Sequence, residues 1–332
     1  MSILLAIESS CDDTSAAVCK DGKILANVIA SQKVHEVWGG VVPELASRAH
    51  QQNILLVVDA ALKQAGISQN NLNAIAFTRG PGLIGSLLVG VSFAKGMAIG
   101  LQLPLIEVNH MQAHVMANCI DSTPSYPHLC LTVSGGHTQI VLVKAPLEME
   151  IVGETIDDAA GEAFDKSAKI LGLPYPGGPL IDKHAKNGNA NRFKFSEPKV
   201  GELDFSFSGL KTSILYFVQK SVKENPNFIQ ENLDDLCASI QKTIVDILLK
   251  KLSIACKKYN IQEIALAGGV SANSELRIRF EQLGIENNWR THIPKFEYCT
   301  DNAGMIAMAA YHKFMKQDFC EQNIEPLARY SI

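Results

Sequence analysis

The sequence predicts an α/β protein built from two similar halves. The first observation is that a strand, a tight polar turn and a returning strand occur twice along the chain. The second is that each of these hairpins leads into further helical and buried-strand patterns. The third is size, because 332 residues, 47% hydrophobic and 19% charged, can bury a large core and suit two lobes of about 100–200 residues each.

The first half begins with an apolar strand over residues 3–8, a polar turn and a second apolar run over 15–19. Asp21 and Gly22 then form a hairpin turn that leads into a third strand over 23–30. The later predicted elements of this half are a helix that Pro43 begins and Gly66 ends, a strand over 74–78, a helix over 84–101 and a strand over 105–108.

The same order begins again after a polar linker at 121–127. Its predicted elements are strands over 129–133 and 138–143, a long helix over 233–259, a strand over 264–266, a helix from about Ser271 and a last helix over 303–315. We predict an N-terminal lobe of residues 1–112, on which the tail 303–332 packs back, and a C-terminal lobe of 113–302 with a helical insertion at about 157–223. The repeated order indicates an internal duplication, although two unrelated α/β units would also fit it.

Composition excludes several classes of protein. With 34 acidic and 30 basic residues and a net charge of -4, the chain does not suit the coating of RNA, although a local patch could hold it. Residues 1–14 lack the pattern of a signal peptide, and Lys95, Gly96 and Pro104 interrupt the most apolar segment, so no membrane span is predicted. The eight cysteines form no C-x-x-C pair, which indicates reduced thiols in a cytoplasmic protein.

Glycine pairs at strand and helix junctions favour a nucleotide site. In the turn 134–138 (Ser-Gly-Gly-His-Thr), glycines would let successive backbone N–H groups approach an anion, although a plain hairpin turn explains this motif equally well. Gly268-Gly269 follows a strand, and Gly177-Gly178 precedes a helix. Neither G-x-G-x-x-G nor the P-loop pattern is present, so dinucleotide and P-loop sites are not supported.

The corresponding turn of the first half, residues 9–14, offers hydroxyl groups and the carboxylates of Asp12 and Asp13. Aspartates at a hairpin turn are usually turn formers. Across a cleft from a phosphate site, one of them could instead hold a cation or accept a proton.

His110 and His114 lie four residues apart and therefore on one face of a helix. The spacing matches H-E-x-x-H, but Met111 stands where a zinc peptidase has its catalytic glutamate, which argues against peptidase chemistry and leaves metal binding open. Asp301 is the best candidate for a third ligand, although Thr300 or Asp301 would also suit the N-cap of the following helix. Two histidines and one carboxylate suit Fe(II) or Zn(II).

Two further patterns have simpler structural explanations. Asp158, Glu162 and Asp165 recur at helical spacing, which usually marks a solvated helix face. Aromatic residues alternate with basic ones at 192–195 and 205–211; contacts with RNA would fit there, but a small core edged by lysines is the expected role.

Taken together, the motifs resemble the tRNA N6-adenosine threonylcarbamoyltransferase family, in its bacterial branch, over essentially the whole chain. This family was once taken for sialoglycoprotein endopeptidases. Nine blocks match in order, which is far more specific than any single block. They are Glu8-Ser-Ser-Cys-Asp-Asp-Thr14, Gly39-Gly-Val-Val-Pro-Glu-Leu-Ala-Ser-Arg48, Gly80-Pro-Gly-Leu83, His110 to His114, Val133-Ser-Gly-Gly-His137, Gly161-Glu-Ala-Phe-Asp-Lys166, Phe205-Ser-Phe-Ser-Gly-Leu-Lys211, Ala267-Gly-Gly-Val-Ser-Ala-Asn273 and Cys299-Thr-Asp-Asn302.

The resemblance implies the duplicated actin/hexokinase/heat-shock-ATPase fold (ribonuclease H-like), with two lobes around a nucleotide cleft. It implies transfer of the threonylcarbamoyl group of threonylcarbamoyl-AMP to N6 of adenosine 37 in tRNAs that read codons beginning with A. It also implies that His110, His114 and Asp301 hold a divalent metal, Fe2+ in the first place and Zn2+ as the alternative, and that Asp12 assists the chemistry. The implied adenylate-binding residues are Thr132, Val133, Ser134, Gly135, Gly136, Asp165, Gly178, Asp182 and Asn273.

The chemistry implied by the resemblance has a physical requirement. The exocyclic amine of adenine is a poor nucleophile, so the carbonyl must be polarised by a metal and the leaving adenylate held by backbone N–H groups. Asp12 would accept the amine proton. One departure is that the family commonly has a glutamate and a glycine where this chain has Gln112 and Ala113; neither is a ligand, so metal binding stands while metal identity is less secure.

The resemblance also implies partners. These are tRNA, threonylcarbamoyl-AMP, a structurally related dimer partner and a small P-loop ATPase, with a separate synthase supplying the adenylate and no membrane. Three alternatives stay open from the sequence: a metal-dependent peptidase, a carbamoyltransferase of the same fold acting on another substrate, and an ATP-binding scaffold without catalysis.

Overall fold

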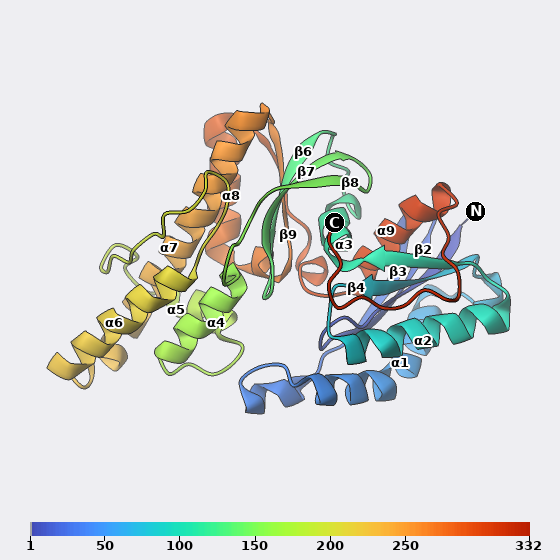
Figure 1. Ribbon diagram of the computed structural model, residues 1–332, viewed down its shortest axis with the longest axis horizontal. Helices are drawn as coiled ribbons and strands as arrows, with labels where there is room; N and C mark the ends of the chain where they lie inside the picture. The colour runs from blue at the N-terminus through green and yellow to red at the C-terminus, as the bar shows by residue number, and fades with distance from the viewer. Residues whose placement is uncertain (1) are drawn as a thin grey trace. The chain divides into compact units, whose positions relative to one another are not determined.

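The computed structural model describes residues 2–332, apart from the side chains of Lys33 and Glu36. The chain forms two compact units, each with its own five-stranded sheet (Figure 1). Unit 1 consists of Met1–Pro124, Ala145–Met149 and Pro294–Ile332, and unit 2 of Ser125–Lys144 and Glu150–Ile293.

Unit 1 is built on a mixed sheet. Its strands are β1 (Ile3–Glu8), β2 (Thr14–Lys20), β3 (Lys23–Ala30), β4 (Ala74–Gly80) and β5 (Leu105–Asn109). They lie in the order β3-β2-β1-β4-β5, with β1 antiparallel to β2 and parallel to β4, and β5 parallel to β4. Because β1 is central and every one of its residues is buried, it is a continuous apolar run that ends in Glu8.

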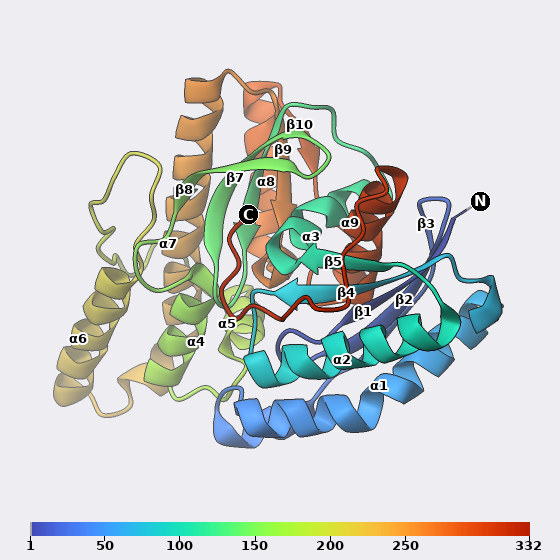
Figure 2. The same cartoon turned by 45° about the vertical axis from the view of Figure 1, so that its right-hand side comes forward.

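Helices cover both faces of this sheet, because successive residues of a strand point to opposite sides. Leu5 of β1 belongs to the core beneath α1 (Pro43–Ala65) and α2 (Ile84–Leu101). Its neighbour Leu4 belongs to the core beneath α9 (Ala303–Met315). Figures 1 and 2 show α1 and α2 on one face of the sheet and α9 on the other.

Local signals in the sequence set the ends of α1. Pro43 begins the helix, where its missing N–H costs nothing. Gly66 ends it in the left-handed region, with φ 64°, and its N–H closes the last turn on the carbonyls of Leu62 and Lys63. The shorter elements of unit 1 are α3 (His110–Met116) and the 3-10 turns η1 (Lys33–Trp38), η2 (Gln69–Asn71), η3 (Ala117–Cys119) and η5 (Phe296–Tyr298).

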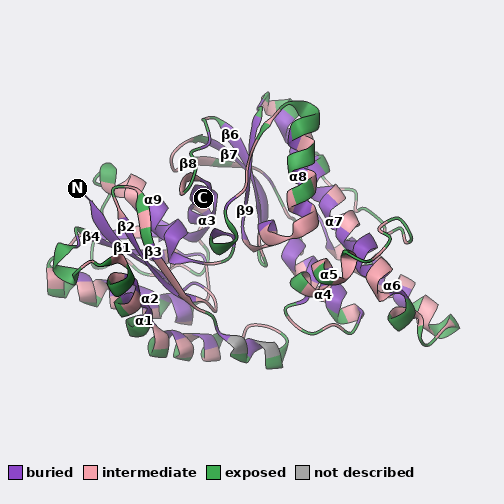
Figure 3. Ribbon diagram, turned by 180° about the vertical axis from the view of Figure 1, so that it is seen from behind, coloured by how far each residue is buried: buried purple, intermediate pink, exposed green. Residues whose placement is uncertain are grey.

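Unit 2 has a second mixed sheet. Its strands are β6 (His128–Val133), β7 (Thr138–Ala145), β8 (Glu148–Glu154), β9 (Glu263–Ala267) and β10 (Arg290–His292), in the order β10-β9-β6-β7-β8. Its helices are α4 (Ala160–Ile170), α5 (Gly177–Ala185), α6 (Ser208–Glu224), α7 (Phe228–Tyr259) and α8 (Ser274–Asn287), with a 3-10 turn η4 (Gly269–Ala272). One hydrophobic core joins β6 and β7 to α4, α5, α6 and α7, and β9 is buried along its whole length (Figure 3).

The two sheets repeat one another. In each, the first strand is central, the second pairs antiparallel with it on one side, and a later strand pairs parallel with it on the other. This confirms the predicted duplicated α/β fold and argues against two unrelated units. The lobe boundaries predicted at residues 112 and 302 stay predictions.

The differences from the predicted elements lie at the edges and ends. The sequence does not predict β8 or β10, because β8 is largely exposed and β10 has only 3 residues. Helix α7 begins at Phe228 rather than at 233, and Asn232, at φ -127° and ψ 16°, interrupts its helical conformation just before the predicted start. The helix expected from about Ser271 begins at Ser274, after η4.

Within residues 2–332, α2 is the one helix whose length and composition would allow it to cross a membrane. The sequence predicts no span here, and the helix packs on β4 and α1 within unit 1. Leu87, Val91 and Ala94 form its buried face. An apolar helix that packs in a protein core can have the same length and composition as a membrane span.

Candidate functional site

His110, His114 and Asp301 form a compact cluster in unit 1. Their possible ligand atoms all lie within 4.8 Å of one another. Oδ1 of Asp301 lies 3.4 Å from Nε2 of His110 and 3.2 Å from Nε2 of His114. The two imidazole rings meet edge to face, with centroids 4.7 Å apart. The four-residue spacing therefore brings both rings to one carboxylate.

Helix α3 positions the two histidines and begins directly at the end of β5. Asn109 caps it, because its Oδ1 accepts hydrogen bonds from the N–H groups of Met111 (2.9 Å) and Gln112 (3.1 Å). Nδ2 of Asn109 donates to the carbonyls of Tyr330 and Ser331, both at 3.1 Å, so the last residues of the chain hold this cap. Asn109 is not among the site residues predicted from the sequence, although an asparagine between a strand and a helix is a capping signal.

Asp301 precedes α9 but does not cap it. The cap is Asn302, whose Oδ1 accepts the N–H of Met305 at 3.0 Å. The alternative that Thr300 or Asp301 forms the N-cap is therefore wrong. The carboxylate of Asp301 faces the two histidines instead.

A fourth ionisable side chain, Glu8, lies behind His110. Glu8 is 0% exposed, and its Oε2 lies 3.1 Å from Nδ1 of His110. Oε2 also accepts the hydroxyl of Thr78 at 2.6 Å, and Oε1 accepts the N–H of Ser10 at 2.5 Å. In the sequence, Glu8 is predicted only as part of a motif. The signal that pointed to it is a carboxylate at the end of a wholly apolar strand, since a buried charge needs partners.

Burial and charge compete to set the ionisation of this cluster. Burial by itself would lower the pKa of His110, but the charges of Asp301 and Glu8 outweigh it and raise that pKa well above its ordinary value. Burial would raise the pKa of Asp301, yet the charge of His110 reverses the effect and lowers it. Burial lowers the pKa of His114. The protein environment therefore favours a charged His110 and a neutral His114.

The donor set of this cluster fits a divalent metal ion. Two imidazole nitrogens and one carboxylate oxygen converge and leave further coordination positions for water or substrate, as in catalytic zinc and non-haem iron sites. The negative charges of Asp301 and Glu8, which favour a proton on His110, favour a cation beside it for the same reason. Nδ1 of His114 is buried without a hydrogen-bond partner among the described residues.

Asp12 lies in the turn between β1 and β2, close in sequence to the contacts of His110. Ser10, two residues earlier, places its Oγ 3.2 Å from Nδ1 of His110. His50 holds the turn between them, with its Nε2 3.0 Å from the carbonyl of Cys11. Asp12 is partly exposed, so a substrate proton can reach it.

In unit 2, the turn between β6 and β7 exposes its two glycines. The N–H of Ser134 donates to the carbonyl of His137 at 2.8 Å and closes the turn. Gly135 and Gly136 are exposed, and within residues 2–332 their N–H groups make no hydrogen bond. Adjacent unpaired N–H groups are what an anion-binding turn requires.

Gly268 packs behind this turn where only glycine fits. Its φ of 84° lies in the left-handed region, and a Cβ there would lie 2.4 Å from the carbonyl oxygen of Val133. Thr132 and Val133 themselves lie inside β6 and are 0% exposed, so their side chains do not reach a ligand at the turn. Within the predicted stretch 132–136, the turn residues 134–136 are the accessible ones.

Asp165 belongs to α4, and its carboxylate contacts the start of α5. Its Oδ1 accepts the N–H groups of Gly177 (2.8 Å) and Gly178 (3.1 Å), which satisfies two otherwise unpaired donors of that helix. Burial raises the pKa of Asp165, against the effect of these two hydrogen bonds. The other two residues of the predicted acidic stripe, Asp158 and Glu162, both form ion pairs with Lys166, at 2.7 and 2.9 Å.

Asp182 and Asn273 meet at the start of α8. Oδ1 of Asp182 accepts the hydroxyl of Ser274 at 2.7 Å. Asn273 caps α8 through the N–H of Leu276 (3.0 Å) and donates from Nδ2 to Gln241 (2.8 Å). These side chains connect α5, α7 and α8 to the end of β9. The structure thus brings two of the predicted nucleotide residues, Asp182 and Asn273, to the start of α8.

The aromatic residues of the segment 205–211 belong to the core. Phe205 and Phe207 are both 0% exposed and stack on each other at 6.4 Å. Asp157 accepts the N–H of Phe207 and the hydroxyl of Ser208, at 2.8 and 2.6 Å, and so holds the start of α6. The core interpretation of this segment is therefore confirmed, and neither phenylalanine offers a stacking surface to RNA.

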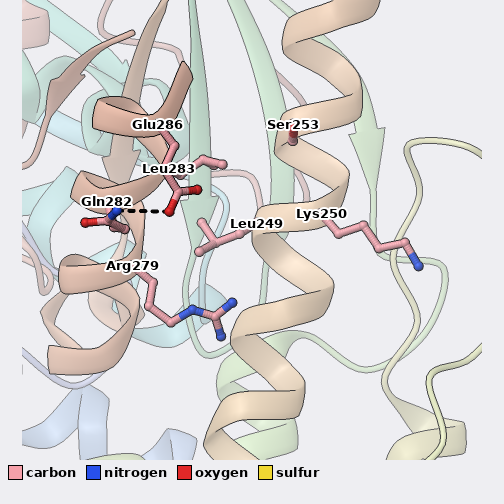
Figure 4. A pocket seen from close by; sticks show the side chains of 7 residues that line it. All are labelled: Leu249, Lys250, Ser253, Arg279, Gln282, Leu283 and Glu286. Carbon is pink, nitrogen blue, oxygen red and sulfur yellow. Dashed lines mark hydrogen bonds between the residues drawn. The ribbon is translucent and has the colours of Figure 1, made fainter. Parts of the chain in front are cut away.

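A shallow groove of about 360 Å³ lies between α7 and α8 (Figure 4), lined by Leu249, Lys250, Ser253, Arg279, Gln282, Leu283 and Glu286. None of the predicted site residues lines it. Lys250 pairs with Glu197 at 2.8 Å, and Arg279 with Asp246 at 2.6 Å. Both of its basic side chains are thus paired with acidic ones.

Fold and site together define a duplicated actin-like α/β protein that carries a two-histidine, one-carboxylate cluster on one unit and an exposed glycine turn on the other. A family model described as tRNA N6-adenosine threonylcarbamoyltransferase matches residues 23–308. The chain belongs to this family.

Curated relatives cover the chain almost end to end. The tRNA N6-adenosine threonylcarbamoyltransferase of Christiangramia forsetii is 59% identical over 99% of this chain and 98% of its own length. That of Riemerella anatipestifer is 58% identical over 100% of this chain and 98% of its own length. These relatives confirm the predicted family and the predicted enzyme class, an acyltransferase, and nothing in them favours a peptidase.

Distant solved structures share the fold. Full-length HypF aligns with a TM-score of 0.64 at 12% identity, over 95% of this chain and 46% of its own. The (R)-2-hydroxyglutaryl-CoA dehydratase component A of Acidaminococcus fermentans aligns with a TM-score of 0.57 at 14% identity, over 94% of this chain and 99% of its own. At this identity the likeness concerns the fold alone, and it agrees with the predicted fold class.

Proposed function

We propose that this chain transfers the threonylcarbamoyl group of threonylcarbamoyl-AMP to N6 of adenosine 37 in tRNAs that read codons beginning with A. Family membership supplies the reaction. The observation that supports the chemistry most directly is the cluster of His110, His114 and Asp301 bordered by the Asp12 turn. In the reaction, the amine nitrogen forms a bond to the carbamoyl carbon, the carbon–oxygen bond to AMP breaks, and the amine proton leaves.

His110, His114 and Asp301 would hold one divalent metal, Fe2+ by the resemblance and Zn2+ as the alternative. When bound, such an ion supplies Lewis-acid polarisation of a carbonyl. The protein's own part is to fix the three ligands, with Asn109 capping α3 and Asn302 capping α9. Metal analysis of anaerobically purified protein should find about one ion per chain, and a His110→Ala variant should lose it.

The adenylate is proposed to bind in unit 2. The unpaired N–H groups of Gly135 and Gly136 suit the phosphate, with Ser134 beside them. Asp165 on α4, Gly178 and Asp182 on α5, and Asn273 at the cap of α8 would shape the site. Thr132 and Val133, being buried in β6, would act only by holding the turn in place.

Asp12 is proposed as the group that accepts the amine proton. A positioned carboxylate can act as a general base, and Asp12 is partly exposed. Asp12→Asn should lower turnover while leaving the metal content unchanged. Loss of metal together with activity would assign Asp12 to metal binding instead.

Partners are proposed from the family: a structurally related dimer partner and a small P-loop ATPase, in the cytoplasm. Unit 1 has exposed apolar residues that suit such an interface. Leu55 and Leu56 of α1 are 64% and 66% exposed, and Leu88 and Ile99 of α2 are 48% and 65% exposed. Leu55→Asp combined with Leu88→Asp should abolish co-purification of the partner, whereas Ile278→Asp, 62% exposed on α8 in unit 2, should not.

The decisive experiment is nucleoside mass spectrometry of tRNA. Unmodified tRNA, threonylcarbamoyl-AMP and the chain with its partners should yield threonylcarbamoyladenosine. Asp301→Ala should abolish the product. Asp59→Asn, a surface carboxylate paired with Lys63 in the same unit, should not. In cells, unchanged threonylcarbamoyladenosine after depletion of this protein, with no second copy present, would contradict the proposal.

A further inference from the structure

We propose that Glu8 is a positioning residue of the metal centre, which holds the Nδ1–H of His110 and so directs Nε2 of that ring toward the ion. The inference rests on the proposed function, in which His110, His114 and Asp301 bind a divalent metal. It adds a residue that itself touches neither metal nor substrate.

The two nitrogens of His110 face different partners. Nδ1 lies 3.1 Å from Oε2 of Glu8, and Nε2 lies 3.4 Å from Oδ1 of Asp301. Since a neutral imidazole carries one N–H, a hydrogen bond from Nδ1 to a carboxylate leaves the lone pair on Nε2. Glu8 thus selects the tautomer that can donate to a metal at the cluster.

Glu8 is itself held firmly. It is 0% exposed and ends the central strand β1. Thr78 of the neighbouring strand β4 donates its hydroxyl to Oε2 at 2.6 Å, and the N–H of Ser10 reaches Oε1 at 2.5 Å. Both carboxylate oxygens are therefore engaged, so the side chain cannot rotate away without leaving buried donors unpaired.

Ser10 is the competing partner of the same nitrogen. Its Oγ lies 3.2 Å from Nδ1 of His110, slightly farther than Oε2 of Glu8 at 3.1 Å. A hydrogen bond to an ionised acceptor is roughly twice as strong as one to a neutral hydroxyl, so Glu8 governs the ring.

His114 provides an internal contrast. Its Nδ1 is buried and has no hydrogen-bond partner within residues 2–332, so no carboxylate orients that ring from behind. Of the two histidines, His110 is therefore the one that an outer carboxylate orients. Loss of such an outer carboxylate typically lowers metal affinity about 10–100-fold.

The test is a titration with Co2+, whose visible absorption reports ligand geometry, of the full chain and its Glu8→Gln variant. Gln keeps the size of the side chain and a neutral acceptor, so we expect affinity to fall about 10-fold or more, with a changed Co2+ spectrum. The matched control is Glu263→Gln in unit 2, which alters a buried carboxylate 2.9 Å from Nε2 of His292. Its Co2+ affinity should equal that of the unchanged chain.

The outcomes separate the two proposals. If the unchanged chain binds Co2+ but His110→Ala does not, the metal site holds. If Glu8→Gln then binds within about 2-fold with an unaltered spectrum, the role of Glu8 is overturned. Failure of the unchanged chain to bind Co2+ would reject the metal site itself.

A second measurement needs no substitution, so it can be made even if Glu8→Gln does not fold. Nitrogen-15 NMR of the Zn2+-loaded chain, labelled at histidine, reports which ring nitrogen carries the proton. We expect His110 to be protonated at Nδ1 and metal-bound at Nε2. Metal bound at Nδ1 would overturn the inference even if Glu8→Gln does not fold.

Discussion

The backbone of Gly161 lies directly against that of Ser134. The N–H of Gly161 donates to the carbonyl of Ser134 at 3.2 Å, and a Cβ on Gly161 would lie 2.6 Å from that oxygen and 2.8 Å from Cα of Gly135. The first turn of α4 is thus the support of the exposed glycine turn. The atoms that a methyl group on Gly161 would meet belong to the backbone of Ser134 and Gly135 and not to a flexible side chain. The glycine turn itself would therefore have to move.

Gly161→Ala should therefore weaken nucleotide binding by moving the turn. We expect lower stability, by about 1–3 kcal/mol for an overpacked site, and weaker binding of an adenylate analogue. Gly136→Ala is the contrasting variant, because a Cβ there meets no atom within 4 Å. Gly136→Ala should keep the thermal midpoint of the unchanged chain but should still bind the adenylate analogue more weakly. Calorimetry measures both quantities. A normal affinity in Gly161→Ala would mean that the turn does not contact the nucleotide.

Phe207→Ala should lower the free energy of unfolding and leave the affinity for tRNA unchanged. The side chain is 0% exposed, so its truncation should cost about 3–5 kcal/mol of unfolding free energy. Denaturant titration measures this loss. At a temperature where the variant remains folded, its affinity for tRNA should match that of the unchanged chain. A selective loss of tRNA binding would restore a direct RNA contact for this segment.

His50 should make the protein less stable in mild acid. Burial lowers its pKa, against the Cys11 carbonyl and the charges of Glu8 and Asp12, while His35 lowers it further. Because the folded state favours the neutral ring, its contribution to stability is complete above the unfolded pKa near 6.5 and is lost as the pH falls through the lower folded value.

The comparison that isolates this effect uses His50→Gln. At pH 7.5 the variant should be about 1–3 kcal/mol less stable, since Nδ1 of His50 lies 2.8 Å from the Thr14 hydroxyl and Nε2 lies 3.0 Å from the Cys11 carbonyl. That difference should shrink as urea titrations are repeated down to pH 5. A difference that stays constant over this range would show that His50 does not titrate on unfolding.

Asn109→Ala should loosen the histidine helix. The variant removes both the cap of α3 and the contacts with the carbonyls of Tyr330 and Ser331. Loss of a cap typically costs about 0.5–2 kcal/mol, and we also expect weaker metal binding because both histidines lie on this helix. Asn273→Ala, which removes the cap of α8 in unit 2, should lower stability similarly and leave metal affinity unchanged. Equal metal affinity in both variants would contradict the prediction.

The sequence by itself determined the element order and much of the site. The helices over 43–65, 84–101 and 303–315 begin and end where predicted, because Pro43, Gly66 and the apolar periodicity act locally. The spacing of His110 and His114 fixed their common face for the same reason. Nine ordered motifs identified the family, because their joint occurrence by chance is far less probable than that of any one.

Only the tertiary structure decided which partners these residues meet. The Asp301 carboxylate lies 187 positions from His114 along the chain, and no local pattern could choose between a helix cap and a ligand until Asn302 was seen to occupy the cap. Glu8 and His110, 102 positions apart, meet because β1 and β5 both lie beside β4 in one sheet. Periodicity in a sequence reports which face a side chain occupies, whereas distances between faces are set by how strands pair and helices pack.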